Sequence, residues 1–401
     1  MKRNHLYIFF ILLFSSAHLF SQQGSSYSMF GLGDFSFSVS SGYEAMGGTS
    51  IAMPDNIAIN FLNPALWTQV NTTRLQAGYR FNQHFISDTR NNQLQNNGTI
   101  NSMSTVFMID TNKRIAASFG IYPSTRINYY VKNIFTIVDG SEVSQGQSEY
   151  QGQGGLSTIY LGLASRVWGP IFAGATFLGN FGSAYYNNKV EYYDIYNYST
   201  YYQKKDNFSG IGFKFGLYSQ LPRGFSIGAY FEKNNTIDIE RQQGYGSDLV
   251  SDTLIYSNAS INAPKKFGVG VGFKTGKFQF GGDFNYLVIS DLNYNSTDDI
   301  KFKNSYSISF GGERLGNLSK MADYFDRITY RAGFGYSNLY YQVMGKDISE
   351  YKFSIGGSFP LSTSGMIDGT LVFGLRGTNS NGLVQDKYIR LIIDISIGEV
   401  W

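Results

Sequence analysis

The residues of this chain that could do chemistry are charged side chains scattered along most of its length. Each lies among alternating apolar and polar residues, on the polar side of its segment: Arg80, Lys214, Glu232, Asp283, Arg331, Asp368, Arg376, Arg390 and Asp394. Charges removed from bulk water must be paired or solvated. We therefore expect ion pairs within the protein, and the alternative is that a basic residue such as Arg331 or Arg390 holds a ligand carboxylate.

Catalytic and metal-binding patterns are weak in this sequence. The chain has no cysteine, and after residue 21 its single histidine is His84. A Ser/His/Asp hydrolase would need a nucleophile in a recognisable setting beside that histidine, and the sequence offers none. We interpret His84 as an exposed residue at the outer end of a strand. Asp298-Asp299 lies in a polar loop without a Cys/His cluster, so we expect no metal, no other cofactor and no enzymatic activity.

The segments that carry these charges alternate apolar residues with polar or small ones. Phe267, Val269, Val271 and Phe273, for example, are separated by single glycines. This period indicates β-strands with one face in an apolar medium. About fourteen such segments occur, near 72–86, 99–110, 113–126, 156–166, 170–186, 206–220, 223–238, 264–274, 277–291, 303–314, 327–341, 349–360, 366–377 and 387–401.

The connections between these segments alternate in length. Those after odd-numbered segments are mostly long and polar, at 87–98, 127–155, 187–205, 239–263, 292–302, 342–348 and 378–386. Those after even-numbered segments are mostly short, although 315–326 is long enough for a short helix. Outer-membrane barrels have an even number of strands, short periplasmic turns and long outer loops. We predict an all-β fold, a transmembrane antiparallel β-barrel of about 14 strands. The Tyr-rich run 185–202 is expected to extend a hairpin beyond the membrane, and the alternative is that it forms a ligand-receiving groove.

Composition excludes several other classes of protein. The chain has 33 Phe, 31 Tyr and 46 Gly, and its mean hydropathy is −0.19. Helical membrane proteins need apolar runs of about 20 residues, which do not occur after residue 21. The formal net charge of +3 falls to +1 without Lys2 and Arg3, so nucleic acid is not expected as a partner. A soluble β-sandwich would need fewer and shorter strands.

The two ends of the chain carry targeting patterns. Residues 1–21 combine Lys2-Arg3, an apolar run and then small polar residues, as in a secretory signal cleaved near Ser21. The final segment alternates isoleucine and leucine with polar residues and ends at Trp401. This ending resembles the carboxy-terminal signal read by the outer-membrane assembly machinery. We therefore expect the outer membrane of a Gram-negative bacterium, with that machinery and the membrane lipids as partners; the oligomeric state stays open.

Residues 22–71 lack the strand pattern and are predicted to form a plug, or hatch, inside a barrel of residues 72–401. The stretch 42–66 holds Gly47-Gly48, Pro54-Asp55 and Asn63-Pro64-Ala65. Glycines permit close approaches of the backbone, and each proline fixes its own φ and removes a donor. We predict that Asn63-Pro64 makes a fixed bend where the plug joins the first strand. Ala65 would be small because the plug meets the wall there.

Met46-Gly47-Gly48, Asp55 and Asn63-Pro64-Ala65, placed just before the first of fourteen strands, resemble the FadL/TodX family. That family consists of outer-membrane channels for long-chain fatty acids and other hydrophobic compounds. The resemblance implies a hatch and passive uptake of a hydrophobic small-molecule ligand. In the family the third strand is kinked inward and opens a side window, and Pro123 lies in the third predicted strand. The equal alternative is a proline at the outer end of that strand, where pairing fades.

A second function remains open at this point. A subgroup of the same fold, including the PorV component of type IX secretion, serves protein export. The alternative is therefore a non-transport barrel that acts as a subunit or shuttle of a protein secretion complex. An apolar ligand pocket bordered by the plug would favour uptake, whereas a filled lumen with a large apolar patch on the outer loops would favour the secretion complex.

Overall fold

The computed structural model describes residues 24–89, 91–139, 142–194, 197–250, 253–296, 299–317, 319, 321–362, 364–380 and 382–399. The predicted signal at 1–21, Asp298 and the terminal Trp401 lie outside the described residues. Within the described residues, no helix combines the length and hydropathy that a membrane crossing requires.

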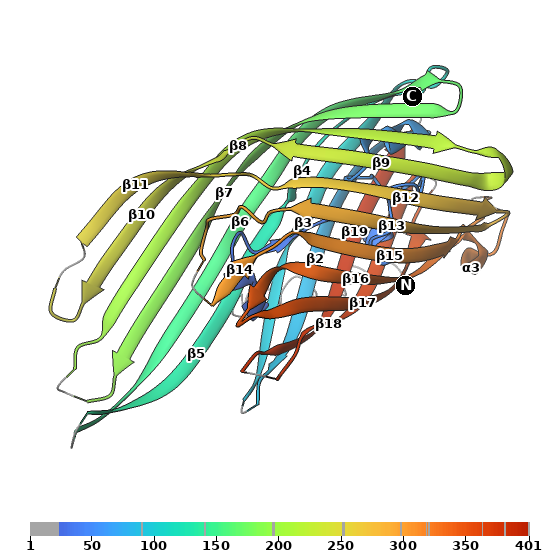
Figure 1. Ribbon diagram of the computed structural model, residues 1–401. Coiled ribbons are helices and arrows are strands. Elements are labelled where there is room, and N and C mark those ends of the chain that lie inside the picture. The colour runs from blue at the N-terminus through green and yellow to red at the C-terminus, as the bar shows by residue number, and fades with distance from the viewer. Residues whose placement is uncertain are drawn as a thin grey trace, which may run out of the picture.

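Fourteen antiparallel strands form a closed ring (Figure 1). In ring order they are β2 (Thr73–Ser87), β3 (Asn92–Asp110), β4 (Ile115–Pro123), β6 (Glu142–Trp168), β7 (Ile171–Tyr192), β8 (Thr200–Gln220), β9 (Phe225–Asn234), β12 (Lys265–Thr275), β13 (Phe278–Val288), β15 (Ser305–Arg314), β16 (Thr329–Val343), β17 (Lys346–Pro360), β18 (Gly365–Gly377) and β19 (Gln385–Glu399). The last strand pairs with the first, from Glu399 opposite Thr73 to Gln385 opposite Ser87. The predicted barrel and its strand number are confirmed.

Along each strand, residues alternate between the outer surface and the interior as the sequence pattern predicts. On β2, Leu75 and Tyr79 are exposed whereas Gln76 and Arg80 are buried. An exposed apolar face over the whole ring suits contact with lipid, and a polar inner face suits a lumen. Most connections at the end that holds Thr73 and Glu399 are short, and this is the periplasmic end in barrels of this class. At the other end the predicted loop 342–348 is instead a tight turn between β16 and β17. The predicted short helix there is α3 (Tyr324–Arg327).

The outward face of β19 allows a test of membrane insertion. Ile395 is 42% exposed beside the fully buried Asp394. Ile395→Arg is expected to destabilise the inserted barrel by roughly 2–4 kcal/mol, because a charge would face hydrocarbon. The amount of heat-modifiable barrel in outer-membrane fractions measures the effect. Lys387→Arg is the matched control, since it puts arginine on the same face at the outer end of the strand; equal losses would show that the strand faces are assigned wrongly.

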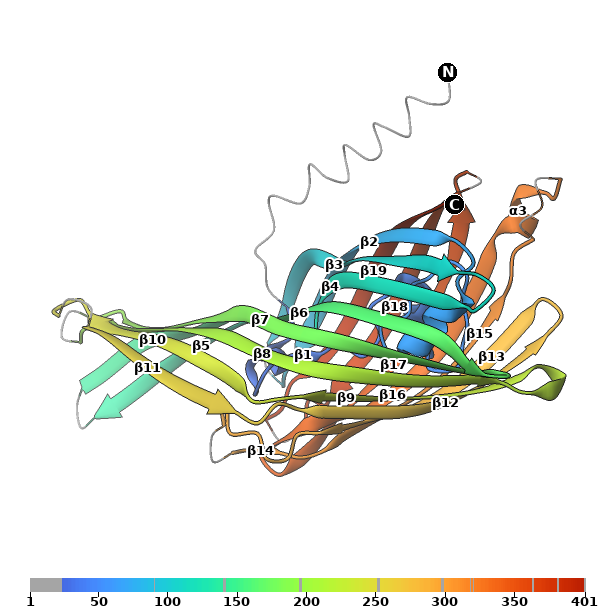
Figure 2. The ribbon, with the colours of Figure 1, turned by 90° about the horizontal axis from the view of Figure 1, so that it is seen from above.

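The largest difference from the sequence prediction lies at the outer end of the barrel. Residues predicted as polar loops at 127–155, 187–205 and 239–263 are mostly strand. They belong to β5 (Thr125–Asp139), β10 (Ile237–Ser247) and β11 (Thr253–Ile261), and to the outer parts of β6, β7 and β8. These strands pair in the order β5-β6-β7-β8-β10-β11 and form an open sheet, here called the outer sheet, that projects well beyond the ring (Figures 1 and 2). Backbone pairing to neighbouring strands continues here although the apolar alternation fades. The Tyr-rich run does extend a hairpin, as predicted.

Residues 24–72 lie inside the ring (Figure 2). They form β1 (Asp34–Phe35), α2 (Ser41–Glu44), two 3-10 turns, η2 (Ser26–Met29) and η3 (Pro64–Gln69), and irregular chain between them. The Ser41 amide donates to Asp394 on β19 at 2.6 Å, and the Ser50 amide donates to Asp283 on β13 at 2.6 Å. These wall strands stand at separate places around the ring, so the segment is held from several sides. A 3-10 turn, η4 (Pro222–Gly224), and the short β14 (Ile300–Phe302) complete the described elements.

Candidate functional site

The joint between the inner segment and the first strand is built around Asn63. Its side chain accepts from the Ala65 amide at 3.1 Å and so caps η3, with Pro64 at the first position. Its amide group donates to the Leu217 carbonyl of the wall at 2.9 Å. A side-chain carbon on Gly174 would lie 2.7 Å from the Pro64 carbonyl carbon, so chain and wall touch here. The structure thus places the three residues at a bend against the wall; whether they gate a passage stays a proposal.

Gly47 and Gly48 lie at a tight turn after α2. Their φ angles are +70° and +93°, in a region that favours glycine. A side-chain carbon on Gly47 would also lie 2.6 Å from the Phe334 carbonyl oxygen of β16. The pair therefore lets the inner segment turn directly against the barrel wall, and it presents no side chain to a ligand.

Arg331 is surrounded by carboxylates from the wall and from the inner segment. Its guanidinium lies 2.7 Å from Asp55, 2.8 Å from Glu313 and 3.4 Å from Asp368. It also donates to Ser358 at 2.5 Å. All three carboxylates and the arginine are buried. This arrangement fastens the inner segment to β16, and it leaves Arg331 with its charge already compensated.

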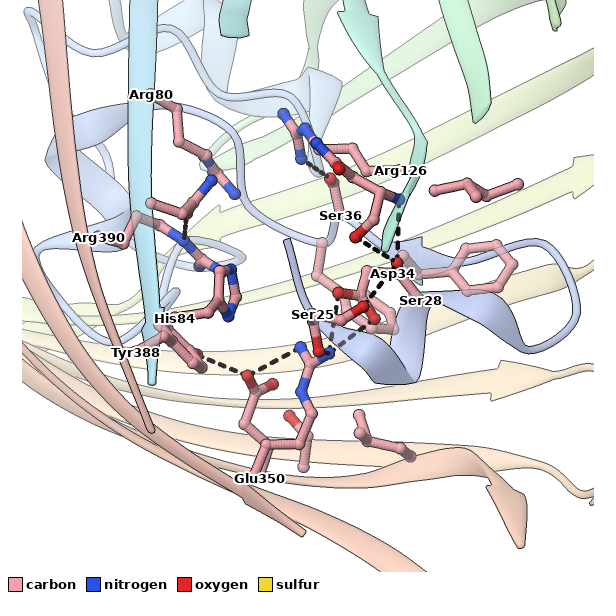
Figure 3. Close-up of a pocket in the computed structure, with 18 of the residues that line it drawn as sticks. Ser25, Ser28, Asp34, Ser36, Arg80, His84, Arg126, Glu350, Tyr388 and Arg390 are labelled. Atoms are coloured by element: carbon pink, nitrogen blue, oxygen red, sulfur yellow. Dashed lines mark hydrogen bonds and ion pairs between the residues drawn. The ribbon is translucent and has the colours of Figure 1, made fainter. Parts of the chain in front are cut away.

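A second charged cluster surrounds a cavity of about 370 Å³ in the outer half of the lumen (Figure 3). Glu44 of α2 lies 3.7 Å from Arg80, 3.8 Å from Lys352 and 4.0 Å from Arg390. Arg390 donates to Asn82 at 2.7 Å. Three cations thus share one carboxylate at distances too long for hydrogen bonds. This cavity, called the charged cavity below, contains the predicted residues Arg80, Arg376 and Arg390.

One part of the charged cavity is lined by a compact set of ion pairs. Arg376 lies 2.8 Å from Asp34 of β1 and 3.1 Å from Glu350 of β17. Tyr388 donates to Glu350 at 2.5 Å. Here the arginine is satisfied by partners from the wall and from the inner segment, as the prediction of plug-to-wall ion pairs expects.

Pro123 marks a break in the wall. The ladder between β3 and β4 reaches only to Met103 opposite Ile121. Beyond the proline, β5 has register pairs with β6 and with β1, but among the described residues none with β3. A proline cannot donate to a ladder, which suits the break. The third strand of the ring thus separates from β3 at Pro123. Residues on both sides of the resulting gap line the charged cavity, namely Asn97 and Thr99 on β3 and Arg126 and Asn128 on β5.

The comparisons with known proteins agree with this architecture. The model of the BamG family matches residues 1–401, the whole chain. The chain belongs to the BamG family. No curated protein matches the sequence.

Solved structures similar to this BamG-family chain are outer-membrane channels. They include the CymD monoaromatic hydrocarbon channel, at 15% identity and TM-score 0.62, over 92% of this chain and 99% of that one. The toluene transporter TodX of P. putida has 12% identity and TM-score 0.61, over 92% and 100%. A Pseudomonas aeruginosa FadL homologue has 11% identity and TM-score 0.64, over 90% and 98%. Identities this low establish the fold alone. The FadL/TodX-type fold is confirmed, and the barrel belongs in the outer membrane of a Gram-negative bacterium.

His84 is not the exposed residue that the sequence suggested. It is 5% exposed, and its Nδ1 lies 3.0 Å from Asp386. His84 shares the inward face of β2 with Arg80 and Asn82, so the alternation already placed its side chain in the lumen. Among the described residues, no group of three or more His, Cys, Asp or Glu side chains is arranged to hold a metal ion.

Apolar residues fill much of the outer half of the lumen in this BamG-family barrel. Tyr27 and Leu32 of the inner segment join one buried cluster with residues of β5, β7, β8 and β16. Loop residue Tyr294 closes the cluster, and its hydroxyl donates to Asp206 at 2.7 Å. Burial raises the pKa of Tyr294 above its usual range, so it stays a donor. These side chains pack against one another instead of lining an open apolar pocket.

Several residues of the charged cavity escaped the sequence analysis. Glu44 and Asp34 have no place in a period-two strand pattern, Arg126 is the last residue of the third predicted strand, and Lys352 lies on a strand whose charges alternate less clearly. One signal was available. Glu44 is the only charged residue between Asp34 and Asp55, in a stretch otherwise made of small and apolar residues. Such a lone charge in a buried segment needs partners.

Proposed function

We propose that this barrel is a non-transport subunit of a protein complex in the outer membrane, of the kind that secretes or handles other proteins. The observation that carries the proposal is the free edge of the outer sheet. Strand β11 has register pairs only with β10 among the described residues. All eight residues 253–260 are exposed, on both faces of the strand.

Edge strands are ordinarily protected by charge, proline or cover. Residues 253–262 contain neither a charged residue nor a proline. They carry Leu254, Ile255 and Tyr256, which are 52%, 47% and 70% exposed. Such an edge suits a partner that adds a strand, because backbone hydrogen bonds supply affinity and side chains supply specificity.

Further apolar side chains extend this surface. Leu249 and Val250, at the tip of the β10-β11 hairpin, are 65% and 61% exposed. At the opposite edge of the outer sheet, Ile134 and Val138 of β5 are 70% and 68% exposed. Exposed apolar clusters on a water-facing surface are typical of protein-binding sites. The apolar packing in the outer half of the lumen and the apolar outer surface are the two features that favour a complex subunit over uptake.

The second candidate is passive uptake of hydrophobic small molecules, such as long-chain fatty acids. The gap beside Pro123 favours it, as does the fold shared with a monoaromatic hydrocarbon channel and a toluene transporter. The lining of the charged cavity speaks against it, because five cationic and three acidic side chains suit a hydrophobic ligand poorly. Fatty acids would bring a carboxylate, so they fit better than hydrocarbons.

Substitutions on β11 test the proposal. Leu254→Lys with Tyr256→Lys is expected to reduce the partner recovered by affinity purification in mild detergent at least about tenfold, because lysines on an edge oppose strand addition. The level of the barrel in the membrane should not change, since both residues are already exposed. Tyr324→Lys with Phe325→Lys, on exposed aromatic residues of α3 at the other end of the barrel, is the control. If both double variants retain the same partners in the same amounts, the outer sheet is not the docking surface.

A further inference from the structure

The charged cavity has an excess of positive charge that the protein does not compensate. Its lining holds Arg80, Arg126, Lys352, Arg376 and Arg390 against Asp34, Glu44 and Glu350, an excess of two positive charges. Arg376 accounts for two of the three carboxylates, through ion pairs of 2.8 and 3.1 Å. Among the described residues, Arg80, Lys352 and Arg390 form ion pairs only with Glu44, and Arg126 forms none with the three carboxylates. Like charges gathered in a poorly solvated space repel one another strongly, so this grouping calls for an anion.

Unpartnered nitrogen atoms point to the same conclusion. Arg80 is 5% exposed, yet its Nε and Nη2 have no hydrogen-bond acceptor among the described residues. Its nearest carboxylate, on Glu44, is 3.7 Å away. The Nε of Arg126 is also without an acceptor. In Figure 3, Arg80 and Arg390, from the paired strands β2 and β19, and Arg126, from β5, gather around one side of the cavity. A buried guanidinium group with free donors is costly unless a ligand accepts from it.

The gap beside Pro123 lies between this side of the cavity and the membrane-facing surface. Met103 and Ile121, the last rung of the β3-β4 ladder, also line an apolar groove on the outside of the wall together with Phe107, Phe119, Ile159 and Leu161. On the inner side of the gap, Thr99 and Arg126 line the charged cavity. Between the groove and the cavity, side-chain contacts connect β3 and β5, such as the hydrogen bond that Arg126 donates to Asn101 at 3.1 Å.

We infer that the charged cavity binds a phosphate group, held by Arg80, Arg126 and Arg390 and entering sideways between β3 and β5. The excess of two positive charges in the cavity favours a phosphate monoester over a carboxylate. A phosphate monoester carries nearly two negative charges near neutral pH, which matches the excess of two, whereas a single carboxylate leaves half of it uncompensated. Guanidinium groups also bind phosphate through paired hydrogen bonds. The phosphate therefore belongs either to a lipid with a phosphomonoester headgroup, whose acyl chains lie in the outer groove, or to a water-soluble phosphate monoester.

Two measurements on the purified full-length barrel distinguish these sources. Chloroform extraction followed by mass spectrometry and phosphorus assay detects a bound phospholipid. Calorimetric titration of lipid-depleted barrel with inorganic phosphate detects a site for the free anion. Bound phosphorus in the extract, or a response to inorganic phosphate, is the expected result, and the first identifies a lipid.

Two substitutions with opposite expected effects on phosphate affinity test which residues bind the phosphate. Arg80→Gln is expected to lower bound phosphate about tenfold or more, because a charged hydrogen bond is lost. Glu44→Gln removes the competing carboxylate and should raise affinity. Arg114→Gln, on an arginine that bonds Asn71 at the barrel end, is the matched control. If Arg80→Gln does not fold, Arg126→Gln replaces it.

Two results would overturn the inference. The first is an extract without phosphorus from a barrel that also ignores inorganic phosphate. The second is Glu44→Gln weakening the binding as much as Arg80→Gln does. The charged cavity and the edge of β11 lie in different parts of the molecule, so either proposal can fail without the other.

Discussion

Deleting residues 42–62 is expected to leave a folded barrel with an open lumen. The ladder of fourteen strands closes on itself between β19 and β2, so the ring needs no inner segment to satisfy its backbone. The deleted residues include Glu44, Ser50 and Asp55, which contact Arg80, Asp283 and Arg331 of the wall. Their loss should produce enlarged conductance in planar bilayers and sensitivity of cells to large antibiotics.

The same deletion separates the two candidate functions. If the protein is a gated hydrophobic channel, uptake of its substrate should fall, because the pocket that concentrates it is lost. If it is a subunit of a protein-handling complex, export or assembly of partner proteins should suffer while uptake of small molecules stays unchanged. Replacement of residues 42–62 by a Gly/Ser linker of equal length controls for chain shortening. A deleted barrel that conducts no better than the intact one would show that the segment is not a plug.

The barrel was predictable because its signal is local. Phe267, Val269 and Val271 are exposed to the outside, and the intervening glycines face the lumen, as the period of two requires. Each strand carries this contrast within about ten residues, and lipid on one side enforces it over the whole ring. Alternation and connection length together were enough to place fourteen strands.

The outer sheet was not predictable by the same means. Residues 253–260 are exposed on both faces, so no apolar period marks them as a strand. Strand β10 exists because it pairs with β8, from Asp238 opposite Ser209 to Ser247 opposite Thr200. Pairing between segments about 30 or more residues apart is decided by the whole fold and leaves little trace in either segment alone.

The contacts between the inner segment and the barrel wall could not be predicted from the sequence either. The inward direction of Arg331 followed from its strand, but its partner Asp55 lies 276 residues away in the sequence. The gap beside Pro123 depends on β1 pairing with β5, from Asp34 opposite Arg126 to Phe35 opposite Thr125. A strand of two residues has no detectable pattern. Which charges meet was therefore knowable only from the three-dimensional arrangement.

Replacing Arg331 by methionine is expected to lower the free energy of unfolding by about 3–5 kcal/mol, the cost of breaking a buried ion cluster by removing one partner. Asp55, Glu313 and Asp368 would then face one another without their common cation. The temperature at which the barrel loses its fast gel mobility measures the loss. Arg314→Met is the matched control, because the Arg314–Asp326 pair at 2.8 Å is largely exposed and such pairs contribute about 0–1 kcal/mol.

A neutral version of the cluster tests the cause of that loss. Combining Arg331→Met with Asp55→Asn, Glu313→Gln and Asp368→Asn removes the three charges that the single variant leaves uncompensated. Buried charges without partners are far more costly than neutral groups that can still hydrogen-bond. The fourfold variant should therefore be more stable than Arg331→Met alone, although it lacks every ion pair of the cluster. If it is less stable, and Arg331→Met costs no more than Arg314→Met, then packing rather than charge holds the inner segment to β16.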